Sequence, residues 1–352
     1  MELLEALKRA VTDGASDLFI VAGGPLSEKL DGHLVPIGEG KIFPQETENL
    51  ISAIYGLASR PMDRYRETGD DDFSFAVNGL ARFRVNTYRQ RGSLAAVVRV
   101  VSFEIPNYQK LGIPEAVMAL AAVAHGMVLV TGTAGSGKST TQACIIDRIN
   151  RTRDAHIITL EDPIEFLHRD QKSIVSQREI AIDTADYLSA LRACLRQAPD
   201  VILLGEMRDY ETIRTAMTAA ETGHLVIATL HTKGAVNTID RIIDSFPSTQ
   251  QSQVRVQLAA VLHSVVSQQL LPDKNGGLVP ACEILHMNGA VRNMIRECKN
   301  YQINNVIQTS AAEGMLSMDQ SILNLCLAGS IARETAVQYA DNPEQMRRRI
   351  PG

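Results

Sequence analysis

Tryptophan is absent from this 352-residue sequence, and aromatic residues together make up only 5% of it. Proteins that bind single-stranded nucleic acid stack the bases on aromatic side chains, so the scarcity of rings leaves little surface for that recognition. The sequence also has no net positive charge, because 35 Lys and Arg residues and 40 Asp and Glu residues give a formal net charge of −5. Proteins that hold a phosphate polymer usually carry a basic face. We therefore expect no nucleic-acid partner.

Cysteine and long apolar runs are scarce as well. The five cysteines are odd in number and form no Cys-x-x-Cys pair, which argues against both a disulfide framework and a four-thiolate zinc site. The longest nearly apolar stretch, residues 117–130, is interrupted by His125-Gly126 and is shorter than the ~20 residues of a membrane-spanning helix. Two of the first five residues are acidic and none is basic, whereas a secretory signal begins with basic residues. We expect a cytoplasmic protein whose membrane contact, if any, is peripheral.

The remaining composition is that of a globular chain, with 45% apolar and 21% charged residues. At roughly 100 to 200 residues per domain, the length allows two or three domains. Residues 1–101 have the pattern of a small α+β domain. Helices are predicted for residues 2–11 and 44–55, the second beginning at Pro44, and strands for residues 17–21, 73–77, 82–88 and 94–101.

Three adjacent acids, Asp70, Asp71 and Asp72, come just before one of these strands. We interpret them as a solvated turn at the start of the strand. Metal binding is the less favoured alternative, because three consecutive carboxylates in an extended chain cannot all face one ion.

Residues 102–114 have the composition of a linker, since they include Pro106, Gly112 and Pro114. Beyond them, residues 115–352 alternate short apolar runs with helical patterns, which predicts an α/β fold with a parallel sheet covered on both faces. The expected strands are residues 128–130, 157–160, 201–204 and 225–228. From Pro247 onward the apolar spacing is helical, with one strand pair near residues 278–285.

A phosphate-binding pattern follows the first of these strands. It fits G-x-x-x-x-G-K-[ST] and continues into a predicted helix; its residues are Gly132, Thr133, Ala134, Gly135, Ser136, Gly137, Lys138, Ser139 and the following Thr140. Glycines let backbone N–H groups turn inward around a phosphate, and the helix N-terminus adds partial positive charge. We expect ATP here, with Lys138 on the β- and γ-phosphates and Ser139 on Mg²⁺.

Two acidic residues follow apolar strands of the same predicted sheet. Glu161 comes after residues 157–160, and Glu206 after residues 201–204 and a glycine. A single acid at a strand end is often only a turn residue, but two in a chain with a phosphate loop favour a catalytic role. We interpret Glu161 as the general base and Glu206 as the residue that organises Mg²⁺ and water.

Two histidines, His224 and His231, stand at the beginning and the end of another predicted strand. Such histidines usually cap a strand or lie at the edge of the core. An odd separation places them on opposite faces of a regular strand, so they cannot chelate one metal together. The open alternative is that one of them senses the γ-phosphate while the other holds a neighbouring loop or subunit.

Four segments in order resemble the Walker A, Asp box, Walker B and His box of the type II and type IV secretion ATPases. They are residues 132–141, 158–166, 204–209, and 220–224 with 229–232. The resemblance extends to the N-terminal segments 14–18, 72–75 and 81–86 and to residues 290–297, Ala-Val-Arg-Asn-Met-Ile-Arg-Glu. Over the whole chain it is closest to the PilT family of type IV pilus retraction ATPases.

That resemblance implies a PAS-like N-terminal domain, a RecA-like ATPase domain with a helical C-terminal end, and a homo-hexameric ring. It implies an ATP-hydrolysing motor that acts at the cytoplasmic face of the inner membrane, docks on a pilus platform protein and drives pilin disassembly. Arg84 and Arg99 match family arginines that reach toward bound phosphate. Without the resemblance, the sequence pattern is equally consistent with exposed cross-strand side chains. His231 is expected among the catalytic residues and His224 among those that bind the nucleotide.

Residues 290–297 resemble a motif of the family that is associated with retraction. On their spacing alone they predict an amphipathic helix with Val291, Met294 and Ile295 on one face. The chain lacks the four-cysteine zinc insertion and the longer N-terminal region of the assembly ATPases, which favours retraction. The alternatives are an accessory paralogue, an assembly or secretion motor and, in other classes, a DNA translocase or an ATP-binding module without catalysis.

Overall fold

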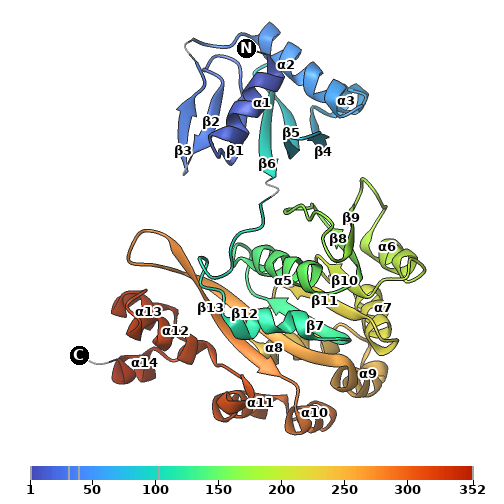
Figure 1. Ribbon diagram of the computed structural model, residues 1–352, viewed down its shortest axis with the longest axis vertical. Helices are drawn as coiled ribbons and strands as arrows, with labels where there is room; N and C mark the ends of the chain where they lie inside the picture. The colour runs from blue at the N-terminus through green and yellow to red at the C-terminus, as the bar shows by residue number, and fades with distance from the viewer. Residues whose placement is uncertain (1, 31, 39, 102–103, 351–352) are drawn as a thin grey trace. The chain divides into compact units, whose positions relative to one another are not determined.

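The computed structural model describes residues 2–30, 32–38, 40–101 and 104–350. Its contacts divide the chain into two compact units, Met1–Glu104 with Glu165–Leu167, and Ile105–Ile164 with His168–Gly352 (Figure 1). Ser102 and Phe103, the first residues of the expected linker, lie outside the described residues. The domain limits 1–101 and 115–352 remain our proposal.

The first unit begins with an amphipathic helix and then builds a single sheet. Its elements are α1 (Leu3–Thr12), β1 (Asp17–Ile20), β2 (Ser27–Leu30), β3 (His33–Pro36), α2 (Pro44–Leu57), α3 (Asp63–Thr68), β4 (Asp70–Val77), β5 (Ala81–Gln90) and β6 (Ser93–Val101). Among the described residues the strands pair antiparallel in the order β3-β2-β1-β6-β5-β4. All three helices pack on one face of this sheet, so the opposite face carries the polar residues of the alternating strands.

The four strands predicted for this unit are confirmed as β1, β4, β5 and β6, and the short hairpin β2–β3 is additional. The interpretation of the acidic triplet as a solvated turn is wrong. Asp70, Asp71 and Asp72 are the first residues of β4, and strand alternation buries Asp71 while Asp70 and Asp72 stay exposed.

The second unit holds a mixed sheet, whose strands are β7 (Gly126–Thr131), β8 (His156–Glu161), β9 (Ile174–Glu179), β10 (Val201–Leu204), β11 (Leu225–Leu230), β12 (Leu262–Pro272) and β13 (Leu278–His286). Within the described part of the chain their order is β13-β12-β7-β11-β10-β8-β9. All neighbours are parallel except β13, which pairs antiparallel with β12. The predicted strands are confirmed, but β9 was not predicted and β12 replaces part of an expected helix.

Helices cover both faces of this sheet, as the sequence predicts. Residues of α4 (Glu115–Met118), η1 (Ala119–Ala122) and α5 (Lys138–Thr152) form one apolar layer. Residues of α6 (Tyr187–Cys194), α7 (Tyr210–Glu221), α8 (Ala235–Asp244) and α9 (Ser248–Val261) form the other. The helical C-terminal end is confirmed and comprises α10 (Gly289–Arg296), η2 (Asn300–Gln302), α11 (Ile303–Thr309), η3 (Ala311–Glu313), α12 (Met318–Leu327), α13 (Arg333–Tyr339) and α14 (Pro343–Arg349).

Candidate nucleotide-binding site

The glycine-rich loop connects the end of β7 to the start of α5 (Figure 1). Gly132 has a φ of 140°, and a Cβ at this position would overlap the backbone oxygen of Gln268 and the Oγ of Ser136. Gly137, with a φ of 83°, lies immediately before the first residue of α5. These two positions therefore require glycine, and the loop delivers Lys138, Ser139 and Thr140 into the first turn of the helix.

The contacts of Lys138 and Ser136 indicate the chemistry of the group that this loop binds. The Nζ atom of Lys138 donates to the carbonyl oxygens of Gly132 at 2.9 Å and Thr133 at 2.8 Å, so the ammonium group rests on the loop itself. The Oγ of Ser136 is buried and has no hydrogen-bond partner among the described residues. A buried hydroxyl without a partner is costly. An ammonium group and a buried hydroxyl without a partner, both beside a helix N-terminus, fit a phosphate group.

Gln268 on β12 forms hydrogen bonds with the phosphate loop and with α5, and nothing in the local sequence pattern indicates this role. Its Nε2 donates to the carbonyl oxygen of Ser136 at 2.8 Å, and its Oε1 accepts from the Oγ1 of Thr141 at 2.7 Å. The amide therefore ties the loop to the first turns of α5 and to the neighbouring strand.

Glu161 and Glu206 lie at the same edge of the sheet because β8 and β10 are parallel neighbours. Glu161 is the last residue of β8, and its Oε1 accepts from the Oγ1 of Thr159 at 2.6 Å and the Nε2 of Gln177 at 3.3 Å. Glu206 follows β10 after Gly205, whose N–H donates to the carbonyl oxygen of Leu160 at 2.8 Å. The carboxyl ends of parallel strands thus carry both predicted acids.

His231 joins the phosphate loop to Glu206. Its Nδ1 lies 3.5 Å from the Nζ of Lys138, and its Nε2 lies 3.1 Å from the Oε2 of Glu206. Because an ammonium group only donates and a carboxylate only accepts, these contacts assign the neutral imidazole with its proton on Nε2. Partial desolvation and the nearby charges of Lys138 and Arg208 hold the pKa of His231 below its ordinary value, which favours this form. Arg208 forms an ion pair with the other oxygen of Glu206.

The structure does not bring His224 to the phosphate loop of its own chain. It precedes β11 at the end where that strand begins, and its carbonyl oxygen accepts from the N–H of Gly126, the first residue of β7. Its Nδ1 lies 2.9 Å from the carbonyl oxygen of Ala219 and so closes the corner between α7 and β11. The geometry of this chain supports the capping alternative; its assignment as a nucleotide-binding residue stays a prediction.

Arg84 and Arg99 lie directly opposite each other on β5 and β6 of the first unit. Like charges in register repel, and each guanidinium is offset by a carboxylate on its other side. Arg84 binds Asp72 through two bonds of 3.2 and 2.7 Å, and the Nε of Arg99 lies 3.0 Å from Asp17. Both arginines are thus cross-strand residues, and their expected contact with phosphate stays a prediction.

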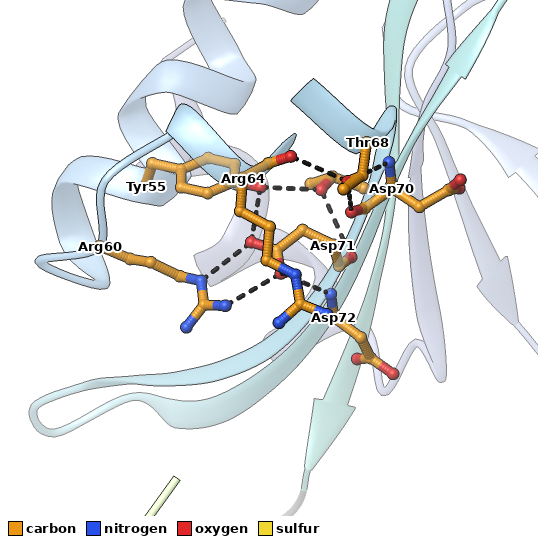
Figure 2. Close-up of polar contacts among 8 residues, drawn as sticks. Tyr55, Arg60, Arg64, Thr68, Asp70, Asp71 and Asp72 are labelled. Carbon is orange, nitrogen blue, oxygen red and sulfur yellow. Dashed lines mark hydrogen bonds and ion pairs between the residues drawn. The ribbon is translucent and has the colours of Figure 1, made fainter. Parts of the chain in front are cut away.

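On the other face of β4, Asp71 anchors the helices of the first unit (Figure 2). Arg60 binds it through two bonds of 2.9 Å each, and the hydroxyl of Tyr55 donates to it at 3.1 Å. Burial alone would raise the pKa of Asp71, but the bonds from Arg60 and Tyr55 hold it below its usual value. Asp71 and Asp72 therefore point to opposite faces of one strand, one fixing the helices and the other holding Arg84.

The segment 290–297 forms most of α10, as predicted. Val291 and Ile295 are buried against the core of the second unit and Met294 packs beside them. Arg292 on the same helix donates from Nη1 to the carbonyl oxygens of Ala259 and Ala260, at the C-terminal end of α9. An arginine in that position satisfies carbonyl groups that a helix end leaves without partners.

A phosphate loop between a parallel strand and a helix, with acids at the ends of two neighbouring strands, defines a P-loop nucleotide-binding enzyme. The sequence model of the Type II/IV secretion system protein family matches residues 2–343, and the chain belongs to this family.

Individual relatives match over nearly the whole chain. The chain is 44% identical over 345 residues to the type IV pilus retraction ATPase PilT of Pseudomonas aeruginosa, covering 98% of this chain and 99% of the relative. It is 46% identical over 319 residues to a twitching motility protein of Neisseria gonorrhoeae, covering 90% and 85%. The crystal structure of the pilus retraction motor PilT with bound ADP superposes with a TM-score of 0.90 at 45% identity, covering 99% of both chains. The resemblance to retraction ATPases is confirmed.

Two further observations concern metal and membrane. In the described ranges, no group of three or more His, Cys, Asp and Glu residues is arranged to hold a metal ion. Mg²⁺ in phosphate-transfer sites takes one or two protein oxygens together with water and phosphate, so a hydroxyl and a carboxylate are a donor set that fits it.

Among the residues that the structure describes, no helix combines the length and apolar character needed to cross a bilayer.

Proposed function

We propose that this chain is an ATP-hydrolysing motor that powers type IV pilus retraction. The observation that carries the proposal is the series of contacts from Lys138 through His231 to Glu206 at the phosphate loop. The whole-chain similarity to retraction ATPases supports the direction of the work that hydrolysis drives.

In the proposed reaction, Lys138 exchanges its two loop carbonyls for phosphate oxygens, and the hydroxyl of Ser136 gains the partner it lacks. Glu161 is the general base that takes a proton from the attacking water, with its orientation fixed by Thr159 and Gln177. Ser139 and Glu206 would hold Mg²⁺, which neutralises charge on the β- and γ-phosphates when it is bound. His231 keeps Glu206 oriented toward the loop.

We further propose a PAS-like fold for the first unit and a RecA-like fold for the ATPase unit. Arg84 and Arg99 would neutralise phosphate charge after leaving Asp72 and Asp17. The protein would act as a homo-hexamer in the cytoplasm, at the face of the inner membrane, on a platform protein of the pilus and through it on pilin. Each of these statements rests on family resemblance rather than on a contact of this chain.

The test of the active site is phosphate release from the purified protein with ATP and Mg²⁺. Glu161→Gln should lower kcat by about 10² to 10⁴ while nucleotide still binds, because only the proton acceptor is lost. Lys138→Ala should weaken nucleotide binding as well. Equal rates in the wild type and both variants would overturn the assignment.

A deletion strain tests the direction of the motor. Loss of retraction leaves pili on the surface, so we expect hyperpiliated cells that do not twitch. Cells without surface pili would instead identify an assembly motor.

A further inference from the structure

The turn that follows His231 is held by residues from distant parts of the second unit. Thr232, Lys233 and Gly234 form this turn, and α8 begins at Ala235. Glu283 on β13 is only 7% exposed, and its Oε1 accepts the N–H of Ala235 at 2.7 Å. From β12, the Oγ of Ser267 accepts the N–H of Gly234 at 2.8 Å.

A chain of hydroxyl groups fixes the same turn from the side of the phosphate loop. The Oγ1 of Thr238 donates to the carbonyl oxygen of Gly234 at 2.8 Å and lies 2.7 Å from the Oγ1 of Thr232. It also lies 3.5 Å from the Oγ1 of Thr131, the last residue of β7 before Gly132. The turn after His231 and the strand that carries the phosphate loop are thus joined through Thr238.

Burying the carboxylate of Glu283 at this position costs free energy. A carboxylate loses most of its hydration when it is buried, and burial raises the pKa of Glu283. The residue before α8 is Gly234 with a φ of 85°, where a serine or aspartate would be strained, so α8 has no capping side chain of its own as α7 has in Asp209. A buried side chain from an edge strand holds the N-terminus of α8 instead, and this ties the position of the turn to β13.

We propose that Glu283 is a positioning residue for ATP hydrolysis: by fixing the turn at residues 232–235, it holds the imidazole of His231 between Lys138 and Glu206. The inference rests on the proposed function, since it assigns a further residue to the same reaction. His231 is 53% exposed at its side chain, so packing alone does not hold its ring. Its placement depends on the backbone that follows it.

A surface ion pair on the same turn supplies a matched control. The Nζ of Lys233 lies 2.9 Å from Asp341, and both side chains are about half exposed. Exposed ion pairs of this kind contribute little to the stability of the fold. Asp341→Asn therefore changes the surroundings of the turn without touching its backbone bonds, and kcat should stay within about twofold of the wild type.

The experiment is a double-mutant cycle on kcat and KM for ATP, with phosphate release as the readout. Glu283→Ala should lower kcat on the order of ten- to a hundredfold with KM changed little, because a small displacement of a catalytic group costs about that much. Glu283→Gln keeps an acceptor oxygen for Ala235 and should retain most of the rate. In the His231→Ala background, Glu283→Ala should lower kcat by less than about twofold further.

The cycle separates positioning from a general structural role. An equal loss of rate from Glu283→Ala with and without His231 would overturn the proposal, as would an unchanged kcat in Glu283→Ala. Should Glu283→Ala fail to fold, Glu283→Asp, which shortens the side chain by one methylene, enters the same cycle. A wild-type protein without hydrolysis, or His231→Ala with a normal rate, would instead count against the proposed function itself.

Discussion

The Nε2 atom of His231 lies 3.1 Å from the Oε2 of Glu206. On its other side the ring faces the ammonium group of Lys138 through Nδ1 at 3.5 Å. Only a neutral imidazole can donate to a carboxylate and accept from an ammonium group at the same time. The structure therefore links the phosphate-binding cation to the acid of the neighbouring strand through one protonation state.

This link predicts how hydrolysis depends on pH. Protonated His231 would present an N–H to Lys138, so the arrangement fails in acid. Because the pKa of His231 is lowered, kcat should hold from neutral pH to below 6.5 and then fall by about tenfold per pH unit as the pH passes below the lowered pKa. A pH–rate profile measures this. His231→Gln should have a lower rate throughout and should lose this acid limb; the same limb in the variant would show that another group causes it.

Gln268 offers a test of how strongly the phosphate loop depends on its neighbouring strand. Gln268→Ala removes one bond to the loop and one to Thr141, so the loop should lose its preset shape and the Kd for ATP should rise about tenfold, which corresponds to about 1.4 kcal/mol. Titration with a fluorescent ATP analogue measures this. The adjacent Gln269 instead bonds to the carbonyl oxygen of Tyr339, and Gln269→Ala should bind ATP as the wild type does. Equal affinities in both variants would contradict the role of Gln268.

Asp71 predicts where the first unit is most sensitive to substitution. Asp71→Asn leaves Arg60 and Tyr55 without a charged acceptor in a buried site and should destabilise the unit by about 2–3 kcal/mol, somewhat less than a fully buried pair because Arg60 is one-third exposed. Because the protein has no tryptophan, thermal unfolding is best followed by far-UV circular dichroism.

Asp70→Asn is the matched control, since Asp70 is an exposed neighbour on the same strand and should change stability by less than about 0.5 kcal/mol. The lowered pKa of Asp71 also predicts how stability depends on pH. The stability that Asp71 contributes is complete above the ordinary pKa of 3.8, and it is lost as the pH falls through the lower pKa of the folded state. Similar transitions for the two variants would show that the Asp71 cluster does not stabilise the unit.

The parts of the site that the sequence predicts are those with local causes. Glycines at fixed spacing around Lys138 follow from the backbone that a phosphate loop requires. Glu161 and Glu206 follow apolar runs, and parallel strands bring their carboxyl ends to one edge. The identity of these residues and the strands that carry them can therefore be read without tertiary information.

The parts of the fold and site that the sequence does not predict depend on contacts between distant segments. Residues 262–272 mix apolar and polar side chains, and their strand state comes from pairing with β7 and β13. The role of Gln268 exists only once that pairing is made. Asp71 lies in an acidic triplet typical of a turn, and its burial depends on Tyr55 of α2 and on Arg60 in the loop between α2 and α3.

The strand order of the second sheet also constrains how the protein is made. β7 lies between β11 and β12, both of which are synthesised long after the phosphate loop has left the ribosome. The first unit, in contrast, pairs β1 with β6 and completes its sheet within the first 101 residues. A nascent chain therefore folds its N-terminal unit early, while the apolar β7 has no paired neighbour until β11 emerges about 100 residues later and lacks its second neighbour, β12, until about 140 residues have followed it. During that interval β7 exposes apolar side chains that the folded sheet buries, and a chaperone that binds apolar segments would protect them.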